Sequence, residues 1–137
     1  MFNGLEIDYQ NIIVQNDGYW PNVDIADFQR SRSIPAAISV DLVKDALLTA
    51  ISEVNISLER FKTIHVSKNI NEYITALYKK AIYSRAKADL IGEFVAISNT
   101  KQQIDTNQNE MEKKLLAEGT RAIRTILGYR RSSVDLI

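Results

Sequence analysis

One run of apolar and small residues, spaced alternately four and three positions apart, constrains the fold of this chain more than any other feature. Its members are Ile70, Ile74, Leu77, Ala81, Ser84, Ala88, Ile91 and Val95. This spacing keeps returning to one face of an α-helix and resembles a coiled-coil seam. The small residues in its middle would let a neighbouring helix approach closely. We therefore expect a helix over residues 70–97, roughly 40 Å long, packed along a second helix.

Two earlier segments also carry helical signals. Asp24 is a candidate N-cap for a short helix to about Ser33, and Pro35 disfavours helix at the residue before it. Ser39 is a candidate N-cap for a helix over residues 39–65. One apolar stripe follows this second helix, formed by Val43, Leu47, Ala50, Val54, Leu58 and Phe61.

The C-terminal part of the sequence predicts a last helix, which a polar stretch separates from the preceding one. Residues 98–110 are polar and rich in Asn and Gln, which predicts a flexible loop or a frayed continuation of the preceding helix. A helix is then expected over residues 110–127, with Gly128 as its C-terminal stop. Its apolar face comprises Met111, Leu115, Leu116, Ala122, Ile123 and Ile126.

The two ends of the chain carry weaker signals. Asn16, Asp17 and Gly18 form a turn signal of the hairpin kind, but a hairpin alone is marginally stable. We expect an all-α fold: a helical bundle with one short and three longer helices. The bundle domain spans residues 21–128, with an extended N-terminal arm over 1–20 and a C-terminal tail over 129–137.

Composition and motifs argue against an enzyme. The chain has no cysteine, which excludes disulfides, thiolate metal sites and cysteine nucleophiles. Its five scattered glycines build no phosphate loop, and no His-carboxylate cluster offers a metal site. The single histidine, His65, sits just past an expected helix end, where a structural role is sufficient. The carboxylate pairs Asp41/Asp45 and Glu110/Glu112 lie near helix starts and need no catalytic role. We expect no catalytic residues, no cofactor and no metal.

Charge and hydropathy narrow the classes of partner that the chain could bind. Seventeen basic residues balance seventeen acidic ones, so the chain lacks the surplus of a general nucleic-acid binder. No apolar run approaches the about 20 residues of a membrane helix, and the N-terminus has no signal-peptide pattern. The charges are uneven: residues 1–30 are mostly acidic and residues 119–137 mostly basic. A ring in which the acidic arm of one subunit meets the basic tail of its neighbour is one hypothesis, and solvated ends are the alternative.

Four aromatic residues also bear on whether the chain contacts neighbouring subunits. Tyr78 and Tyr83 lie away from the centre of the seam on their helix, while Trp20 and Phe28 lie in the arm and the short helix. A helix with two apolar faces usually contacts two partners, so we interpret these four side chains as candidate inter-subunit contacts. Packing within the chain itself is the alternative.

Three stretches together resemble a known family. They are "YWPNVDIADFQRSRSI", "AAISVDLVKDALLTAISEVNISLERFK" and "YITALYKKAIYSRAKADLIGEF", the last followed by a polar stretch and "RAIRTILGYRRSSVDLI". Their order and spacing, over residues 19–137, resemble the head completion (head stabilisation) proteins of contractile-tailed bacteriophages, the L-type gene products. No catalytic motif is part of this resemblance.

The resemblance implies a virion adaptor. Such proteins join the portal vertex after DNA packaging and form a homo-oligomeric ring, typically of twelve subunits. The ring would contact the portal protein and the neck or tail completion proteins, and double-stranded DNA would pass through it without specific binding. The protein would be made in the host cytoplasm and located at the head-tail interface, with no membrane. By analogy with helical adaptors, the portal-binding residues would be Tyr129, Arg130, Arg131, Val134, Leu136 and Ile137.

Two alternatives remain open at the level of sequence. A small helical DNA-binding regulator would use the last helix, where Arg121 and Arg124 are the candidate contacts. A helical scaffold subunit outside phages would share every feature except the resemblance.

Overall fold

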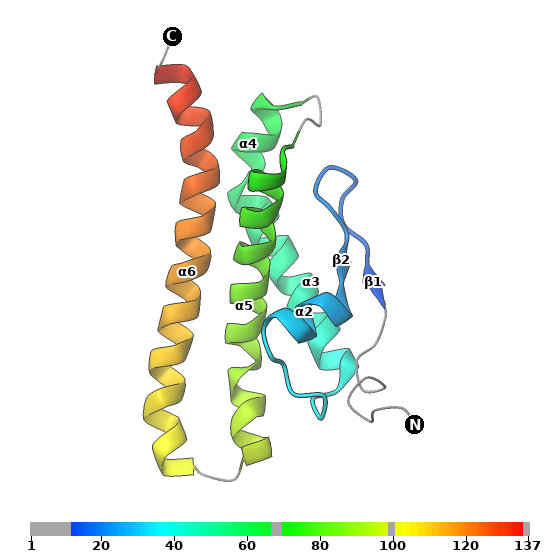
Figure 1. Cartoon of the computed structure of the whole chain (residues 1–137), viewed down its shortest axis with the longest axis vertical. Helices are drawn as coiled ribbons and strands as arrows, with labels where there is room; N and C mark the ends of the chain where they lie inside the picture. The colour runs from blue at the N-terminus through cyan, green and yellow to red at the C-terminus, as the bar shows by residue number, and fades with distance from the viewer. Residues whose placement is uncertain (1–11, 67–69, 99–100, 136–137) are drawn as a thin grey trace.

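The computed structural model describes residues 12–66, 70–98 and 101–135, with side chains for 12–66, 70–93 and 108–128. Within this part the fold is mostly helical, as predicted, with one very small sheet (Figure 1). The elements in chain order are β1 (Ile13–Val14), β2 (Val23–Asp24), α2 (Ile25–Ser31), α3 (Val40–Ser57), α4 (Glu59–Ile64), α5 (Glu72–Ser98) and α6 (Lys101–Asp135). Helix α5 lies between α6 on one side and α3 on the other. None of the described helices is long and apolar enough to cross a membrane.

The caps expected from the sequence start α2 and α3. The Asp24 side chain accepts a hydrogen bond from the backbone N–H of Ala26 at 3.0 Å. The Ser39 hydroxyl accepts one from the backbone N–H of Asp41 at 3.2 Å. Each cap satisfies a helix N–H that has no partner within its own helix. The short helix ends at Ser31, and Ser33 then takes a left-handed conformation (φ 53°) that turns the chain toward α3.

The apolar stripe predicted for residues 39–65 is the inner face of α3 and α4. All six of its residues are buried, from Val43 to Phe61. The structure divides the predicted single helix at Leu58, which caps both halves. The stripe stays in register because Leu58 still accepts a backbone hydrogen bond from Lys62 at 3.1 Å.

Helix α5 is buried on two sides. The seam side faces α6, where a Cβ built on Gly119 would lie 3.4 Å from the Ala81 carbonyl oxygen and 3.7 Å from Ser84 Cβ. This close approach confirms the role of the small residues in the seam. The opposite side packs within the same chain: the Tyr78 hydroxyl bonds to Asn55 of α3, and the Tyr83 hydroxyl bonds to Asp27 of α2.

Helix α6 corrects the prediction for the C-terminal part. It runs without a break from Lys101 to Asp135, so neither the predicted 98–110 connection nor the stop at Gly128 is present. Gly128 does not adopt the positive φ of a C-terminal cap, which in the described glycines is found at Gly18 alone. The internal glycine is tolerated because it costs only about 1 kcal/mol relative to alanine, which packing of α6 along α5 can offset. Residues 129–135 therefore continue the helix and form no separate tail.

The N-terminal prediction needs a second correction. Strands β1 and β2 pair antiparallel, with Ile13 opposite Asp24 and Val14 opposite Val23, so the hairpin is present in a wider register. Its loop does not project as an arm, because Trp20 is buried and stacks on Tyr78 with ring centroids 4.4 Å apart. Val14, Tyr19 and Trp20 belong to the core, and residues 1–11 lie outside the described part.

Candidate functional site

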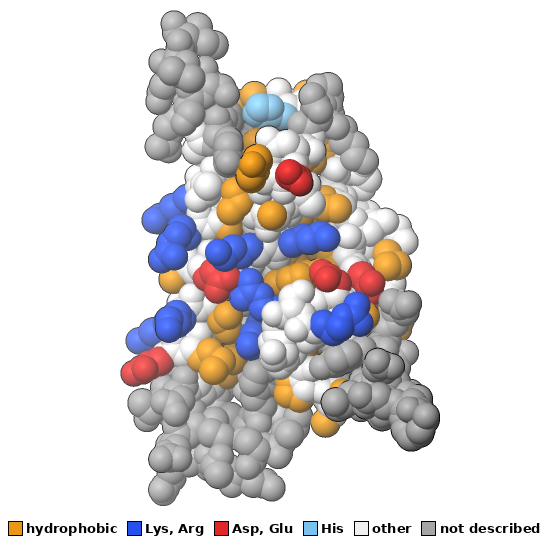
Figure 2. All heavy atoms as spheres, viewed as in Figure 1, with side chains coloured by type: hydrophobic (Ala, Val, Ile, Leu, Met, Phe, Trp, Pro, Cys, Tyr) orange, Lys and Arg blue, Asp and Glu red, His pale blue; other side chains and the backbone are white. Residues whose placement is uncertain are grey.

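Five cations lie together on one side of the layer formed by α5 and α6, and we call them the basic face. They are Arg32 after α2, Lys80 and Lys87 of α5, and Lys114 and Arg121 of α6. The guanidinium of Arg32 pairs with the Glu118 carboxylate at 2.7 Å, and the Lys87 ammonium donates to the Arg32 carbonyl oxygen at 2.9 Å. Lys80, Glu118 and Arg121 line one shallow depression between α5 and α6. Figure 2 shows Lys and Arg side chains in a band across this side.

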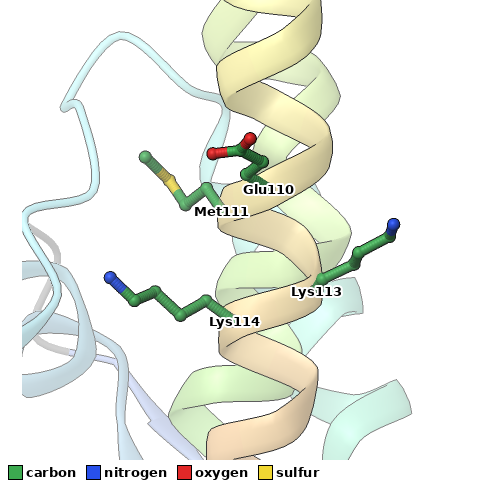
Figure 3. Close-up of a pocket in the computed structure, with 4 residues that line it drawn as sticks. All are labelled: Glu110, Met111, Lys113 and Lys114. Carbon is green, nitrogen blue, oxygen red and sulfur yellow. The ribbon is translucent and has the colours of Figure 1, made fainter.

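Lys114 joins this group through helix geometry. It precedes Glu118 by four residues and Arg121 by seven, spacings that keep all three on one side of α6. In Figure 3 the Lys114 side chain points toward the loop that follows α2, away from the Lys113 side chain.

The electrostatics of the basic face show that its positive charges crowd one another. The hydrogen bond from Arg32 holds the pKa of the Glu118 carboxyl below its usual range. Burial lowers the pKa of the Lys87 ammonium, and the charge of Arg32 lowers it further, while Glu118 opposes the shift. Glu118 is the carboxylate that pairs with Arg32, and Asp24 and Asp27 lie nearby, where Asp27 accepts a hydrogen bond from Tyr83. The face therefore presents a surplus of positive charge.

A group of carboxylates, the acidic face, lies between α3 and α5 and on the adjoining side of α6. It comprises Asp45, Glu53, Asp89, Glu93 and Glu112. Asp45, Asp89 and Glu93 line a shallow groove with the exposed Leu42. Burial raises the pKa of the Asp89 carboxyl, and the charges of Glu53 and Glu112 raise it further, against the effect of Arg85. Arg85 pairs with Glu53 at 3.3 Å, so this face retains a negative surplus.

The two faces lie on opposite sides of the molecule. At about 100° of rotation per residue, the nine positions from Lys80 to Asp89 turn α5 by about 180° relative to its starting direction. The same nine-residue spacing separates Glu112 from Arg121 on α6. Two neighbouring helices thus present positive charge on one side and negative charge on the other.

The part of the chain that the structure describes holds no group of three His, Cys, Asp or Glu residues placed to ligate a metal. Figure 3 shows a surface hollow along α6, lined by Glu110, Met111, Lys113 and Lys114, whose side chains diverge instead of meeting at a point. His65 stacks on Phe61 with centroids 4.3 Å apart, and its carbonyl oxygen accepts a hydrogen bond from Tyr19. His65 thus ends α4 and packs its ring on that helix, while its Nε2 is buried without a hydrogen-bond partner among the described residues.

The aromatic residues predicted to contact neighbouring subunits are core residues of the chain itself. Trp20, Phe28, Tyr78 and Tyr83 are at most 5% exposed. Phe28 packs on Tyr83 with ring centroids 5.1 Å apart, and the Tyr83 hydroxyl donates to Asp27 at 2.5 Å. An inter-subunit contact through these rings would require the core to open. The structure shows the alternative, in which the four rings pack within the chain itself.

The structure leaves fewer acidic residues free for the predicted pairing of an acidic arm with a basic tail. Three of its acidic residues are used within the chain: Asp17 pairs with Lys62 at 3.3 Å, Asp24 caps α2, and Asp27 accepts from Tyr83. Glu6 and Asp8 lie outside the described residues, as do Leu136 and Ile137 of the predicted portal-binding set. Tyr129, Arg130, Arg131 and Val134 lie on the last turns of α6.

Sequence reasoning missed both charged faces. Each is assembled from helices that are far apart in the chain, so no continuous run of like charge marks it. The local signal that was available is the seven-residue spacing of Lys80 and Lys87 on α5 and of Lys114 and Arg121 on α6.

Comparisons with known proteins give a consistent result. The family model described as phage head completion protein (GPL) matches residues 14–137. The chain is 37% identical over 150 aligned residues to a protein of Haemophilus phage HP1 (strain HP1c1) named "Probable head completion/stabilization protein", and the match covers all of both chains. No solved structure matches the chain.

Proposed function

The chain belongs to the family of phage head completion proteins, and from this premise we propose that it is the adaptor that docks on the portal after DNA packaging. The family makes it a non-enzymatic structural component of the virion head, as the sequence resemblance implied. The finer proposal is that copies of the chain form a ring on the portal. This ring extends the DNA channel and presents a surface to the neck or tail completion proteins.

The extent of the family match carries the proposal. It runs over residues 14–137 and so includes all of the hairpin except Ile13, every described helix and both charged faces. A protein that completes or stabilises the head can do so at the opening through which the DNA entered, which is where the proposed ring would sit. Helix α6, with 35 residues, is about 50 Å long. If copies stand side by side with α6 parallel to the DNA channel, their ring would lengthen the channel substantially.

The C-terminal end of α6 is the proposed portal contact. Figure 1 shows this end reaching past α4 at one end of the molecule. Tyr129, Arg130, Arg131 and Val134 lie there, and Leu136 and Ile137 follow in the sequence. A projecting helix end with aromatic, arginine and aliphatic side chains has the composition of residues that anchor protein interfaces.

The test is to mix the purified chain with the portal ring of the same phage. The mixture is weighed by native mass spectrometry and imaged by cryo-electron microscopy. We expect a stoichiometric ring, of twelve copies if it follows the family, stacked on the portal. A chain truncated after Gly128 should not dock, while a variant of the exposed Ile56 on α3 should dock normally.

One outcome would replace the proposal. A chain that ignores the portal but shifts duplex DNA in a salt-dependent manner would indicate the DNA-binding alternative through Arg121 and Arg124. The family membership already argues against that alternative and against a scaffold outside phages.

A further inference from the structure

We propose that the basic face of one copy binds the acidic face of the next copy, head to tail, and that this contact joins the subunits of the ring. The inference rests on the proposed function and names the surfaces through which the ring forms. The occupant of each face is a second copy of this chain.

Charge complementarity is the first argument. Five cations outnumber Glu118 and the nearby Asp24 and Asp27, so the basic face has a positive surplus. Five carboxylates less the charge of Arg85 leave the acidic face with four negative charges. The faces are opposite in sign, which is the arrangement that fixes partner choice and register at an interface.

The position of the faces is the second argument. They lie about 180° apart around α5 and around α6, as the nine-residue spacings show. Two different, complementary patches on opposite sides form a heterologous contact, which repeats from copy to copy and closes into a ring when the rotation permits. A self-complementary patch would stop at a dimer instead.

A DNA backbone would account for the basic face alone. It would leave the acidic face unexplained, and the acidic face would be repelled from phosphates. Using the basic face between subunits also removes its cations from the channel wall, where tight phosphate binding would slow the passage of DNA. The observations therefore favour a second copy over nucleic acid.

Charge-reversal variants test the contact. Lys80→Glu with Lys114→Glu and Arg121→Glu makes both faces negative, and Asp45→Lys with Asp89→Lys and Glu93→Lys makes both faces positive. All six side chains are exposed, so each variant should fold, which circular dichroism and thermal melting verify. Each variant alone should need at least about tenfold more protein than the unchanged chain to fill the portal, because like charges then meet at every junction.

Mixing the two variants is the decisive step. An all-negative copy and an all-positive copy are complementary at both junctions, so an equimolar mixture should restore the ring with equal numbers of the two variants. Native mass spectrometry of the mixture on the portal counts them. The control, Arg60→Glu on α4, makes the same kind of charge reversal at an exposed cation that belongs to neither face, and it should assemble normally.

The outcomes separate the inference from the proposed function. If the unchanged chain forms no ring on the portal, the proposed function fails and the inference fails with it. If the unchanged chain forms the ring and the variants do so equally well, the inference alone is overturned. A mixture that does not recover, combined with loss of duplex binding in the all-negative variant, would assign the basic face to DNA and overturn the inference as well.

Discussion

Tyr78 joins three parts of the chain through one hydroxyl group. It donates to Asn55 Oδ1 at 2.6 Å and accepts from Asn16 Nδ2 at 2.8 Å, and Asn55 Nδ2 donates back to Asn16 Oδ1 at 3.0 Å. This closed triangle links the hairpin loop, α3 and α5. Buried polar groups arranged in this way specify one packing, because any other packing would leave donors or acceptors unsatisfied.

Removing that hydroxyl should destabilise the chain without changing its shape. We expect Tyr78→Phe to lower the free energy of unfolding by about 1–3 kcal/mol, since the two asparagine side chains lose a buried partner. The matched control is Tyr73→Phe on the same helix, where the side chain is 65% exposed and the effect should stay within about 0.5 kcal/mol. Urea unfolding measures both. Equal effects of the two substitutions would contradict the role of the triangle.

The buried tyrosines also predict a limit on stability at alkaline pH. Burial raises the pKa of Tyr78 and of Tyr83 above the ordinary value of 10.0, and the hydrogen bond to Asp27 raises that of Tyr83 further. The unfolded chain ionises these phenols near pH 10 while the folded chain keeps them neutral. Their contribution is therefore complete below that pH and is lost as the pH rises above it.

The measurement is urea unfolding at a series of pH values from about 8 to about 11. The free energy of unfolding should fall steeply above about pH 10, and Tyr83→Phe should make that fall less steep. A Tyr83→Phe variant with an unchanged slope would show that this phenol is not protected in the folded chain.

At the scale of elements, the continuity of α6 is the main difference from the sequence-based expectation. Helix-ending signals such as Gly128 act locally, with a preference of about 1 kcal/mol. A helix that continues along a partner gains buried apolar contacts over its length, here through Leu115, Ala122 and Ile126. The extended interface outweighs the local preference, so the helix passes through the glycine.

This explanation and the capping hypothesis predict opposite effects on stability when Gly128 is replaced by alanine. Because a Cβ on Gly128 would meet no atom within 4 Å, Gly128→Ala should stabilise the chain by about 0.5–1 kcal/mol through helix propensity. A capping glycine in the left-handed region would instead be destabilised by alanine. Gly18, with φ 90°, is the comparison, and Gly18→Ala should destabilise. Thermal melting of both variants distinguishes the two readings.

At the scale of the whole molecule, zero net charge hides a separation of charge. Seventeen cations and seventeen carboxylates cancel in the sum, yet α5 and α6 carry positive charge on one side and negative charge on the other. A neutral chain of this kind avoids strong non-specific attraction to DNA while keeping two surfaces for its own copies.

The assembled ring should accordingly be sensitive to salt. Raising the ionic strength from about 0.05 M to about 0.5 M shortens the range of charge interactions severalfold, so fewer copies should remain on the portal. Native mass spectrometry after equilibration at each salt concentration, or sedimentation in parallel, measures the occupancy. An assembly indifferent to salt would count against contacts between charged faces.

The sequence by itself determined the features that depend on near neighbours. The caps at Asp24 and Ser39, the buried stripe of α3 and α4, and the small-residue seam of α5 were all readable, because helix periodicity and capping involve residues within a few positions of one another. The family resemblance was readable for the same reason, since it rests on the order of such local patterns.

The tertiary structure alone decided what depends on distant residues. Trp20 of the hairpin loop is a core residue because it stacks on Tyr78, and the second side of α5 is covered by α2 and α3 of the same chain. The charged faces arise because folding brings Arg32 to Glu118 and Asp89 toward Glu112. Burial and charge pairing are properties of groups in space, and a linear pattern does not encode which distant groups will meet.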